Sequence, residues 1–477
     1  MPSNRYSPVN LDQGRSKSFT TWKRPLVAVV LAFLCNIESG MLAMGEWPYM
    51  STIDHDAAST FFGYATAANK AAHVTFTFVF AIWAYKSSSI RIPMLVGRCI
   101  TLVGCAMYIL VEFIPTNRRW WMLACYVIFG VGFGTSPLLR SYIASATADD
   151  NRASAFALLS GANVLSVMIG PIAQMSFAGL PYPGFSIIPP YISIHIYTAP
   201  IWFAVIANAI AIVLTLFFFT DTEKAIEEQD ASSKRISFTS IREQLNRFIS
   251  LDVSWTLIAV VILEKMISSL FNTTMSVIVG PLMSSLYAQT GPQMLLLMGT
   301  AQIAVGFIAV GFTALFVVCD LGKHVSCRAL FAFSNILMIA GYAITYPYPL
   351  ISNPTQPFNE TTRTGCNPLE YSWCDSQLVV NIVLFNCIMV VISGLAIPST
   401  MMSLDTIYSK VIGNGDQSIM QSVFTLADSV MMIVGPIYGS AMFSSMGMSY
   451  LQIINGVIYT IGTVLWFAAW KWLQPYN

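Results

Sequence analysis

Twelve long apolar stretches divide the 477-residue chain and constrain its fold more than any other feature. A hydrocarbon core about 30 Å thick needs roughly 20 apolar residues for each helical crossing, so twelve crossings take up about half of the chain. Hydrophobic residues make up 55% of the sequence and charged residues 10%. We expect the spans at 24–46, 61–85, 92–114, 120–143, 153–176, 195–219, 253–281, 293–318, 327–347, 377–403, 417–441 and 449–470.

Each stretch predicts an α-helix, because hydrocarbon offers no hydrogen-bond partner for free backbone groups. None shows the alternating pattern of a membrane β-barrel. The first stretch follows about two dozen polar residues and is too long for the apolar core of a signal peptide, so we expect it to stay as helix 1. The predicted fold class is therefore an all-α membrane protein with twelve transmembrane helices.

The basic residues fall on alternate sides of these helices. If the N-terminus is cytosolic, eighteen Lys and Arg residues lie in cytosolic segments and only Arg118, Arg119 and Arg363 lie opposite. The positive-inside rule demands this asymmetry. Both termini are thus expected in the cytosol, and the net charge of +1 is uninformative.

One long polar connection separates six helices from six. The expected organisation is a cytosolic N-terminal tail at 1–23, an N-terminal six-helix bundle at 24–219, a cytosolic linker at 220–252, a C-terminal six-helix bundle at 253–470 and a cytosolic C-terminal tail at 471–477.

The two halves carry an internal repeat. Gly170-Pro171 in helix 5 matches Gly435-Pro436 in helix 11, and Asn163 matches Asp428 at the same offset. Glycine followed by proline predicts a helix-break motif in each half. Parallel six-helix repeats related by an axis along the membrane normal place substrate sites near the midplane, between the halves.

These features resemble the major facilitator superfamily. The Gly170-Pro171 stretch is similar to that superfamily's helix-5 signature, and the resemblance is densest from Pro137 to Gln174. Within the superfamily the chain resembles the lysosomal members. That resemblance implies the major facilitator fold, an endolysosomal membrane and conduction of chloride-type anions, whereas the superfamily at large implies alternating access.

Two parts of the superfamily pattern are altered. The loop between helices 2 and 3 usually has a Gly, an Asp and a basic run, but Ala81 to Arg91 keeps only Lys86 and Arg91. The helix-4 arginine that often accompanies proton coupling is missing before Gly130-Val131-Gly132. Proton coupling therefore cannot be inferred by that route.

Ionisable residues at membrane depth define the expected transport path, because each costs about 2.5–3.5 kcal/mol on insertion scales and needs a partner or water. Glu38 falls near the middle of helix 1, and Glu264 and Lys265 near the middle of helix 7. The two sequential residues point about 100° apart, so we expect Lys265 to pair with Glu38 across the halves. The alternative is a static buried ion pair or a side chain that snorkels to the lipid headgroups.

Further polar groups extend this path. Asn163 and Asp428 lie seven residues before their Gly-Pro pairs and could bind an ion or only contact a neighbouring helix. Lys70 and His73 share one face of helix 2 and would suit a pH-sensitive anion path. Arg140 ends helix 4 and could attract anions or anchor the helix at the headgroups.

The long loop between helices 9 and 10 is expected outside the cytosol. Cys366 and Cys374 lie there, in a compartment where disulfides persist, and we expect them to be bridged. Asn359-Glu360-Thr361 is an N-glycosylation pattern on the same side.

An enzyme is not expected, because the four histidines are scattered and no nucleophile elbow or metal-spaced cluster is present in the sequence. The sequence predicts no cofactor and no metal. Its expected partners are a small ion or solute and the lipid bilayer, with no nucleic acid, and it sets no oligomeric state. We hypothesise chloride-type anion conduction, with an ion-coupled carrier of a small organic solute and a nontransporting receptor or scaffold as alternatives.

Overall fold

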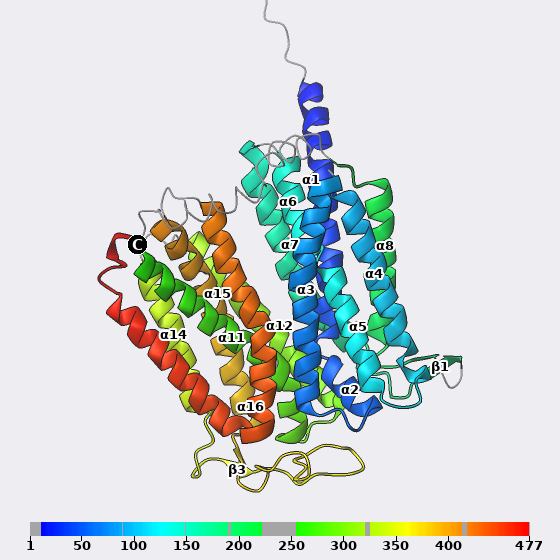
Figure 1. Cartoon of the computed structure of the whole chain (residues 1–477), viewed down its shortest axis with the longest axis vertical. Coiled ribbons are helices and arrows are strands. Elements are labelled where there is room, and N and C mark those ends of the chain that lie inside the picture. The colour runs from blue at the N-terminus through cyan, green and yellow to red at the C-terminus, as the bar shows by residue number, and fades with distance from the viewer. Residues whose placement is uncertain are drawn as a thin grey trace, which may run out of the picture.

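The computed structural model describes residues 11–87, 89–147, 149–188, 192–221, 254–319, 325–412 and 417–476. Residues 1–10 of the expected N-terminal tail, the expected linker beyond residue 221 and Asn477 of the C-terminal tail lie outside these ranges. Figure 1 shows two groups of long helices side by side, α1–α8 in one and α11–α16 in the other.

The N-terminal half contains eight α-helices and a short hairpin among the described residues. They are α1 (Leu11–Leu42), α2 (Glu46–Ile53), α3 (Ser59–Ser87), α4 (Arg91–Ile109), the 3₁₀ helix η1 (Leu110–Phe113), α5 (Arg118–Phe133), α6 (Ser136–Ala146), α7 (Asp149–Met175), the antiparallel strands β1 (Phe185–Ile188) and β2 (Ile192–Ile194), and α8 (Ala199–Phe217).

The C-terminal half repeats the plan of long helices. Its described elements are α11 (Trp255–Ser285), α12 (Gly291–Val318), α14 (Cys327–Thr345), the antiparallel strands β3 (Asn353–Pro354) and β4 (Leu378–Val379), α15 (Ile382–Ile412), α16 (Gln417–Ala468) and the 3₁₀ helix η2 (Gln474–Tyr476).

Twelve crossings follow from these helices. Ten described helical stretches are long and apolar enough to span a membrane. One of them, α16, contains two spans, because Gly447 has a φ of +79° that only glycine adopts readily and turns the chain there. The twelfth is α3, whose 29 residues are long enough but whose Asn69, Lys70 and His73 lower its hydropathy. The expected twelve-helix, two-repeat fold is confirmed.

Several boundaries differ from expectation. Helix α1 begins at Leu11 instead of residue 24, and α15 ends at Ile412 instead of residue 403. Pro171 lies inside α7 and Pro436 inside α16, so neither Gly-Pro pair breaks its helix. The prediction of helix-break motifs was wrong in this respect, because neighbouring helices hold the chain helical where a proline removes one backbone donor.

The Gly-Pro pairs are instead places of close helix packing. A Cβ on Gly170 would lie 2.8 Å from the backbone carbon of Gly40 in α1, and a Cβ on Gly435 would overlap the Thr273 side chain in α11. Small residues at such crossings let helices approach where lipid provides no hydrophobic drive for association.

The start of α1 and the described C-terminal residues lie at one end of the molecule, which we call the termini end, and the 346–381 loop lies at the opposite end, the loop end (Figure 1). A single hydrophobic core fills the loop end and joins the halves, with Trp47 and Phe62 from one half and Leu282 and Phe443 from the other. At the termini end the core is divided.

Two separate cores occupy the termini end. One contains only residues of the N-terminal half, from Ala28 to Phe219, and the other only residues of the C-terminal half, from Leu257 to Leu473. The halves contact each other mainly through α3 against α16 and α7 against α12. Within the described residues, the two halves are therefore joined by packing at the loop end and share no core at the termini end.

Candidate functional site

Four charged side chains from both halves form the candidate site. Lys265 in α11 is 7% exposed, and its Nζ lies 4.0 Å from Oδ1 of Asp428 in α16. The same Nζ lies 3.5 Å from the Met401 sulfur in α15 and 5.3 Å from the centre of the Phe424 ring. An ammonium over an aromatic face gains a further attraction when water is excluded. Lys265 is thus held from several sides.

Asp405 and Arg140 complete this four-residue charge cluster. The Asp405 carboxylate in α15 interacts electrostatically with Lys265, Asp428 and Arg140, and Arg140 comes from α6 in the opposite half. Asp405 and Arg140 are both exposed, and within the described residues neither forms an ion pair shorter than 4.0 Å. The site therefore contains one ion pair and two charges of opposite sign that water can reach.

Repeat-related positions carry different chemistry in the two halves. Asn163 in α7 accepts a 2.9 Å hydrogen bond from the Asn36 side chain in α1. Its counterpart Asp428 in α16 instead pairs with Lys265 in α11. Helix α1 thus meets α7 through neutral amides, whereas α11 meets α16 through charges. Only the C-terminal member of this duplicated pair can hold an ion by charge.

Glu38 does not meet Lys265, so that predicted pair is wrong. Its side chain is fully buried within the N-terminal half, where Asn208 of α8 donates a 2.8 Å hydrogen bond to Oε2. Arg98 of α4, also fully buried, reaches Oδ1 of Asn208 at 3.5 Å. Arg98, Asn208 and Glu38 form a static polar cluster inside one bundle. The sequence predicted that Glu38 lies within the first spanning helix but not the neighbour that it faces.

Glu264 is likewise enclosed in its own half. It is 1% exposed, and Asn335 of α14 donates to its Oε2 at 3.4 Å. A Cβ on Gly462 would lie 2.9 Å from the same oxygen, so the span after Gly447 closes the other side. The prediction that Glu264 lies on a central path is wrong, because its carboxylate lies between helices of the C-terminal half.

Lys70 and His73 lie deeper toward the loop end, on α3. Both are half-buried, and the Lys70 ammonium lies close enough to His73 to act on it electrostatically. The partner of opposite sign is Glu46 at the start of α2, whose carboxylate interacts with Lys70. This cation and its carboxylate belong to one half, unlike the charge cluster around Lys265.

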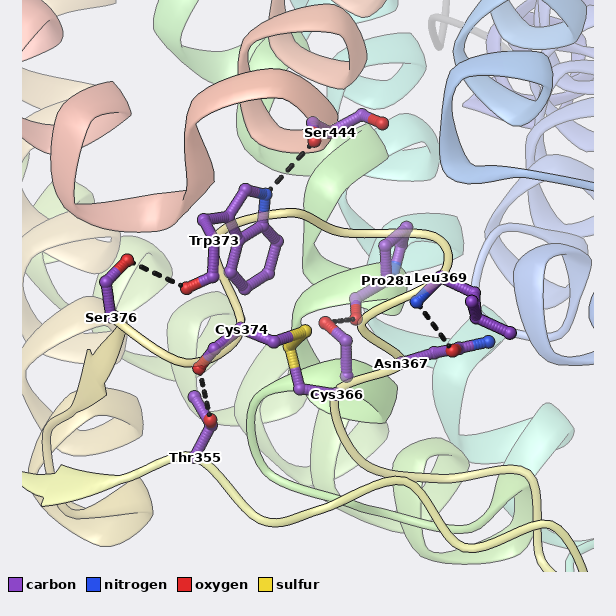
Figure 2. The surroundings of a disulfide bond; sticks show 10 residues. Pro281, Thr355, Cys366, Asn367, Leu369, Trp373, Cys374, Ser376 and Ser444 are labelled. Atoms are coloured by element: carbon purple, nitrogen blue, oxygen red, sulfur yellow. Dashed lines mark hydrogen bonds between the residues drawn. A yellow bond between two sulfur atoms is a disulfide. The ribbon is translucent and has the colours of Figure 1, made fainter.

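The loop at the other side of the molecule is tied down by a disulfide. Cys366 and Cys374 are bonded, with a Cα–Cα distance of 5.6 Å, and Figure 2 shows their surroundings. Trp373 donates to the Ser444 carbonyl at 3.0 Å, and Thr355 donates to the Cys374 carbonyl at 2.9 Å. Asn359 is exposed on the same loop.

Sequence reasoning missed Asp405 because the tenth span was ended at residue 403. A usable signal was present: Asp405 follows Pro398 by seven residues, so the two residues share a face of α15. Among the described residues no group of three or more His, Cys, Asp and Glu side chains could hold a metal.

Comparison with known proteins agrees with this architecture. Residues 29–355 match the family described as Major Facilitator Superfamily. The chain is 23% identical over 488 aligned residues to Major facilitator superfamily domain-containing protein 8 of Xenopus laevis, covering 96% of this chain and 92% of that protein.

Solved structures of transporters share the fold. One is a bacterial homolog of the human lysosomal transporter Spinster, inward-facing and occupied, with a TM-score of 0.65, 11% identity and coverage of 95% of this chain and 97% of that one. Another is a D-xylose-proton symporter, with a TM-score of 0.64, 12% identity and coverage of 95% and 97%.

Two homologous six-helix halves around charged groups define a multi-pass membrane transport protein. The chain belongs to the major facilitator superfamily. The resemblance to this superfamily is confirmed, and within it the chain is similar to Major facilitator superfamily domain-containing protein 8.

Proposed function

We propose that this protein is an alternating-access carrier of a small solute. The observation that carries the proposal is the distribution of the hydrophobic core: one core joins both halves at the loop end, and separate cores stabilise each half at the termini end. A conducting channel needs a path through both ends at once. A carrier needs one end closed while the other can part, which is the arrangement that these cores favour.

The charge cluster is the proposed solute site. Arg140 belongs to one half and Lys265, Asp405 and Asp428 to the other, so a solute bound among them contacts both halves. Such a solute can shift the equilibrium between two states only if it binds one of them better. A site that spans the moving interface meets this requirement directly.

The balance of charge favours a zwitterionic solute over a lone anion. Lys265 and Asp428 neutralise each other, which leaves the exposed Arg140 and Asp405 with opposite signs. A carboxylate on the solute would bind Arg140, and an ammonium would bind Asp405. Charge-assisted hydrogen bonds of this kind are about twice as strong as neutral ones.

Counterflow in proteoliposomes tests the proposal. The purified chain would be reconstituted with an unlabelled amino-acid mixture inside and each labelled amino acid outside, and with labelled neutral sugars as matched probes. We expect transient accumulation of at least one zwitterion, and its loss in Arg140→Gln and in Asp405→Asn. Chloride current without counterflow of any solute would refute a carrier.

Chloride conduction is the second candidate, supported by the resemblance to lysosomal relatives and by the three cations Lys70, Lys265 and Arg140. Each of these cations has a carboxylate as an interaction partner. Recording anion current across the organelle membrane with wild type and Lys70→Ala tests it, because loss of the current in the variant would favour a chloride path.

We also propose an endolysosomal membrane, with the termini end in the cytosol and the loop end in the lumen. The excess of basic residues at the termini end, the disulfide and the exposed Asn359 support this orientation. A glycan on Asn359 would show as a shift in electrophoretic mobility that glycosidase treatment and Asn359→Gln both abolish.

A further inference from the structure

Glu264 is a buried carboxyl inside the C-terminal half that the proposed solute site does not use. It is 1% exposed, and Asn335 of α14 donates to its Oε2 at 3.4 Å. Among the described residues its Oε1 has no hydrogen-bond partner, and none of the ion pairs found there involves it. A charged carboxylate without a cation is costly in an apolar interior, whereas the neutral acid can both donate and accept hydrogen bonds. These surroundings favour the neutral acid.

The helices packed against Glu264 present groups that do not balance a negative charge. On α11 the adjacent residue, Lys265, pairs with Asp428 instead. From α14 the facing side chain is the uncharged amide of Asn335. From α16 it is Tyr459, a phenol that interacts electrostatically with the carboxylate and is neutral at ordinary pH.

A stripe of polar residues runs along residues 448–468 of α16, which we call the last span. Gln452, Asn455 and Tyr459 follow one another at intervals of three and four, so they share one face of the helix. Gly462 continues this face, and a Cβ there would lie 2.9 Å from the buried carboxylate. From the first of these residues to the last the helix rises about 15 Å, which is half of a hydrocarbon core about 30 Å thick. The stripe therefore leads from the loop end to the level of the carboxylate.

Helix α14 presents a matching stripe to the last span. The Gln452 amide donates to the Thr345 hydroxyl at 3.0 Å and to the Thr345 carbonyl at 3.1 Å. One turn further from the loop end, the Tyr342 ring lies 6.0 Å from the Tyr459 ring. Asn335 follows on the same face of α14 and reaches the carboxylate. The two helices thus enclose a column of buried polar side chains, which we call the polar column.

Several polar atoms of the column lack a hydrogen-bond partner among the described residues. They are Glu264 Oε1, Tyr342 Oη, Gln452 Oε1, Asn455 Nδ2 and Tyr459 Oη. The Tyr342 hydroxyl comes near the Asn455 amide, and the Tyr459 hydroxyl near Ser268, without the geometry of a hydrogen bond. Buried polar groups of this kind are normally satisfied by internal water, and each such water makes about three hydrogen bonds. Because these atoms lie in one column, a file of water can connect them.

The polar column begins at a small cavity at the loop end. Thr345 and Gln452 line this cavity together with Gln377 and Leu378 of the 346–381 loop. Its volume of about 10 Å³ is close to the space that one water molecule needs. The lining residues all belong to the C-terminal half, so this entrance does not pass between the halves. Water at the loop end therefore has a route toward the buried carboxylate that avoids the solute site.

We propose that Glu264 is a proton-binding site inside the C-terminal bundle, served from the loop end by the polar column between α14 and the last span. A proton from the loop-end solution passes along the file of water and side chains and binds the carboxylate, which becomes the neutral acid. Release reverses the step and restores the carboxylate. The Tyr342 and Tyr459 hydroxyls suit this relay, because each can accept one proton while it donates another.

The proton site is linked to the solute site through α11, and this link rests on the proposed function. Glu264 and Lys265 are adjacent, with Cα atoms about 3.8 Å apart. A proton on Glu264 removes a negative charge beside the Lys265–Asp428 pair and so changes the potential at the solute site. Because linkage is reciprocal, a solute that binds the protonated protein better also tightens proton binding. The proton is then a coupling ion for the carrier.

Infrared difference spectra of the full-length protein in lipid test the site without any solute. The carbonyl stretch of a neutral carboxylic acid is separate from the bands of amides and carboxylates, and it shifts when deuterium replaces the acid proton. At a pH of about 7, where a carboxyl in water is ionised, we expect a neutral-acid band that disappears in Glu264→Gln. Glu38→Gln is the matched control, because it changes a buried carboxyl of the other half, and it should leave the Glu264 band in place.

Exchange in heavy water tests the polar column. Gln452→Met replaces the polar side chain at the entrance with an apolar one of similar size, and it should slow the deuterium shift of the Glu264 band by about tenfold, the effect of one lost hydrogen-bonded link. Tyr459→Phe removes only a hydroxyl without a hydrogen-bond partner in the described structure, so it should fold and should also slow the shift. Gln421→Met, at an exposed position of α16 outside the column, should leave the rate unchanged.

Two results would overturn the inference. One is a neutral-acid band that is the same in the wild type and in Glu264→Gln, and the other is exchange as fast in both column variants as in the wild type. The outcomes also separate this inference from the proposed function. Amino-acid counterflow without a Glu264 band would overturn the proton site and leave the carrier intact, whereas an exchanging Glu264 band without counterflow of any amino acid would overturn the carrier and leave the proton site.

Discussion

Gly63 lies at a close approach of the two halves, and replacing it by alanine should open the loop end. Gly63 lies in α3, and a Cβ at this position would overlap the Ser440 side chain in α16 and lie 2.8 Å from the Pro436 carbonyl oxygen. The carbonyl belongs to a helix backbone and cannot rotate away. Gly63→Ala must therefore separate α3 from α16 when the loop end is closed.

The size of the effect follows from the packing. Inserting a methyl group into a well-packed contact typically costs about 1–3 kcal/mol. If the closed state alone carries this cost, the ratio of closed to open molecules falls by about 5- to 150-fold. If α3 and α16 kept this contact in both the closed and the open state, the same cost would instead lower the free energy of unfolding.

Two glycine variants serve as controls. Gly161→Ala in α7 places its methyl group where nothing lies within 4 Å, so the ratio should not change. Gly435→Ala overlaps Thr273, but α11 and α16 belong to the same half, so it should lower the melting temperature without opening the loop end.

The assay is the labelling rate of Ser51→Cys by a membrane-impermeant maleimide applied at the loop end. Ser51 is partly buried and lines, together with Trp47, a pocket between the halves at the loop end. The thiol of Ser51→Cys should therefore react faster when the halves part. We expect faster labelling only in Gly63→Ala. Equal rates in Gly63→Ala and Gly161→Ala would refute the claim that this contact closes the loop end.

Three further predictions concern the charges and the disulfide. Asp428→Asn removes the ion-pair partner of Lys265 and should lower counterflow by about tenfold or more, measured as initial rate at equal protein content. Glu38→Gln should keep counterflow near the wild-type rate, since the amide can still accept from Asn208 within one bundle; a complete loss would return Glu38 to the transport path. Cys366→Ser opens a loop of eight-residue separation and should cost about 2.5 kcal/mol of stability, seen as a lower melting temperature that reduction of the wild type reproduces.

The sequence predicted the helix on which most ionisable residues lie, but not their partners. Glu38, Glu264 and Lys265 were all expected near the middle of their helices, and two of the three turned out to face the interior of a single bundle. A helical wheel orders the faces of one helix and carries no information on which neighbour each face meets. Pairing across helices depends on crossing angles and side-chain reach, which no single segment encodes.

Helix ends limited the prediction of the site. Asp405 was placed outside the tenth span because hydropathy falls near residue 403, yet α15 continues to Ile412 and brings Asp405 to Lys265, Asp428 and Arg140. Hydropathy indicates which residues contact lipid, whereas a helix that lines a polar interface can continue where its residues are no longer apolar.

The sequence by itself determined the environment, the helices and the duplication. Unpaired backbone groups are too costly in hydrocarbon for any other spanning structure, and the repeat of Asn163-Gly170-Pro171 as Asp428-Gly435-Pro436 is readable in the letters. Only the tertiary structure decided that Lys265 meets Asp428 and not Glu38, and that, in the part of the chain that the structure describes, the halves share a core only at the loop end. Those outcomes depend on how two folded bundles fit against each other, because packing between surfaces is set by the shape of both partners at once.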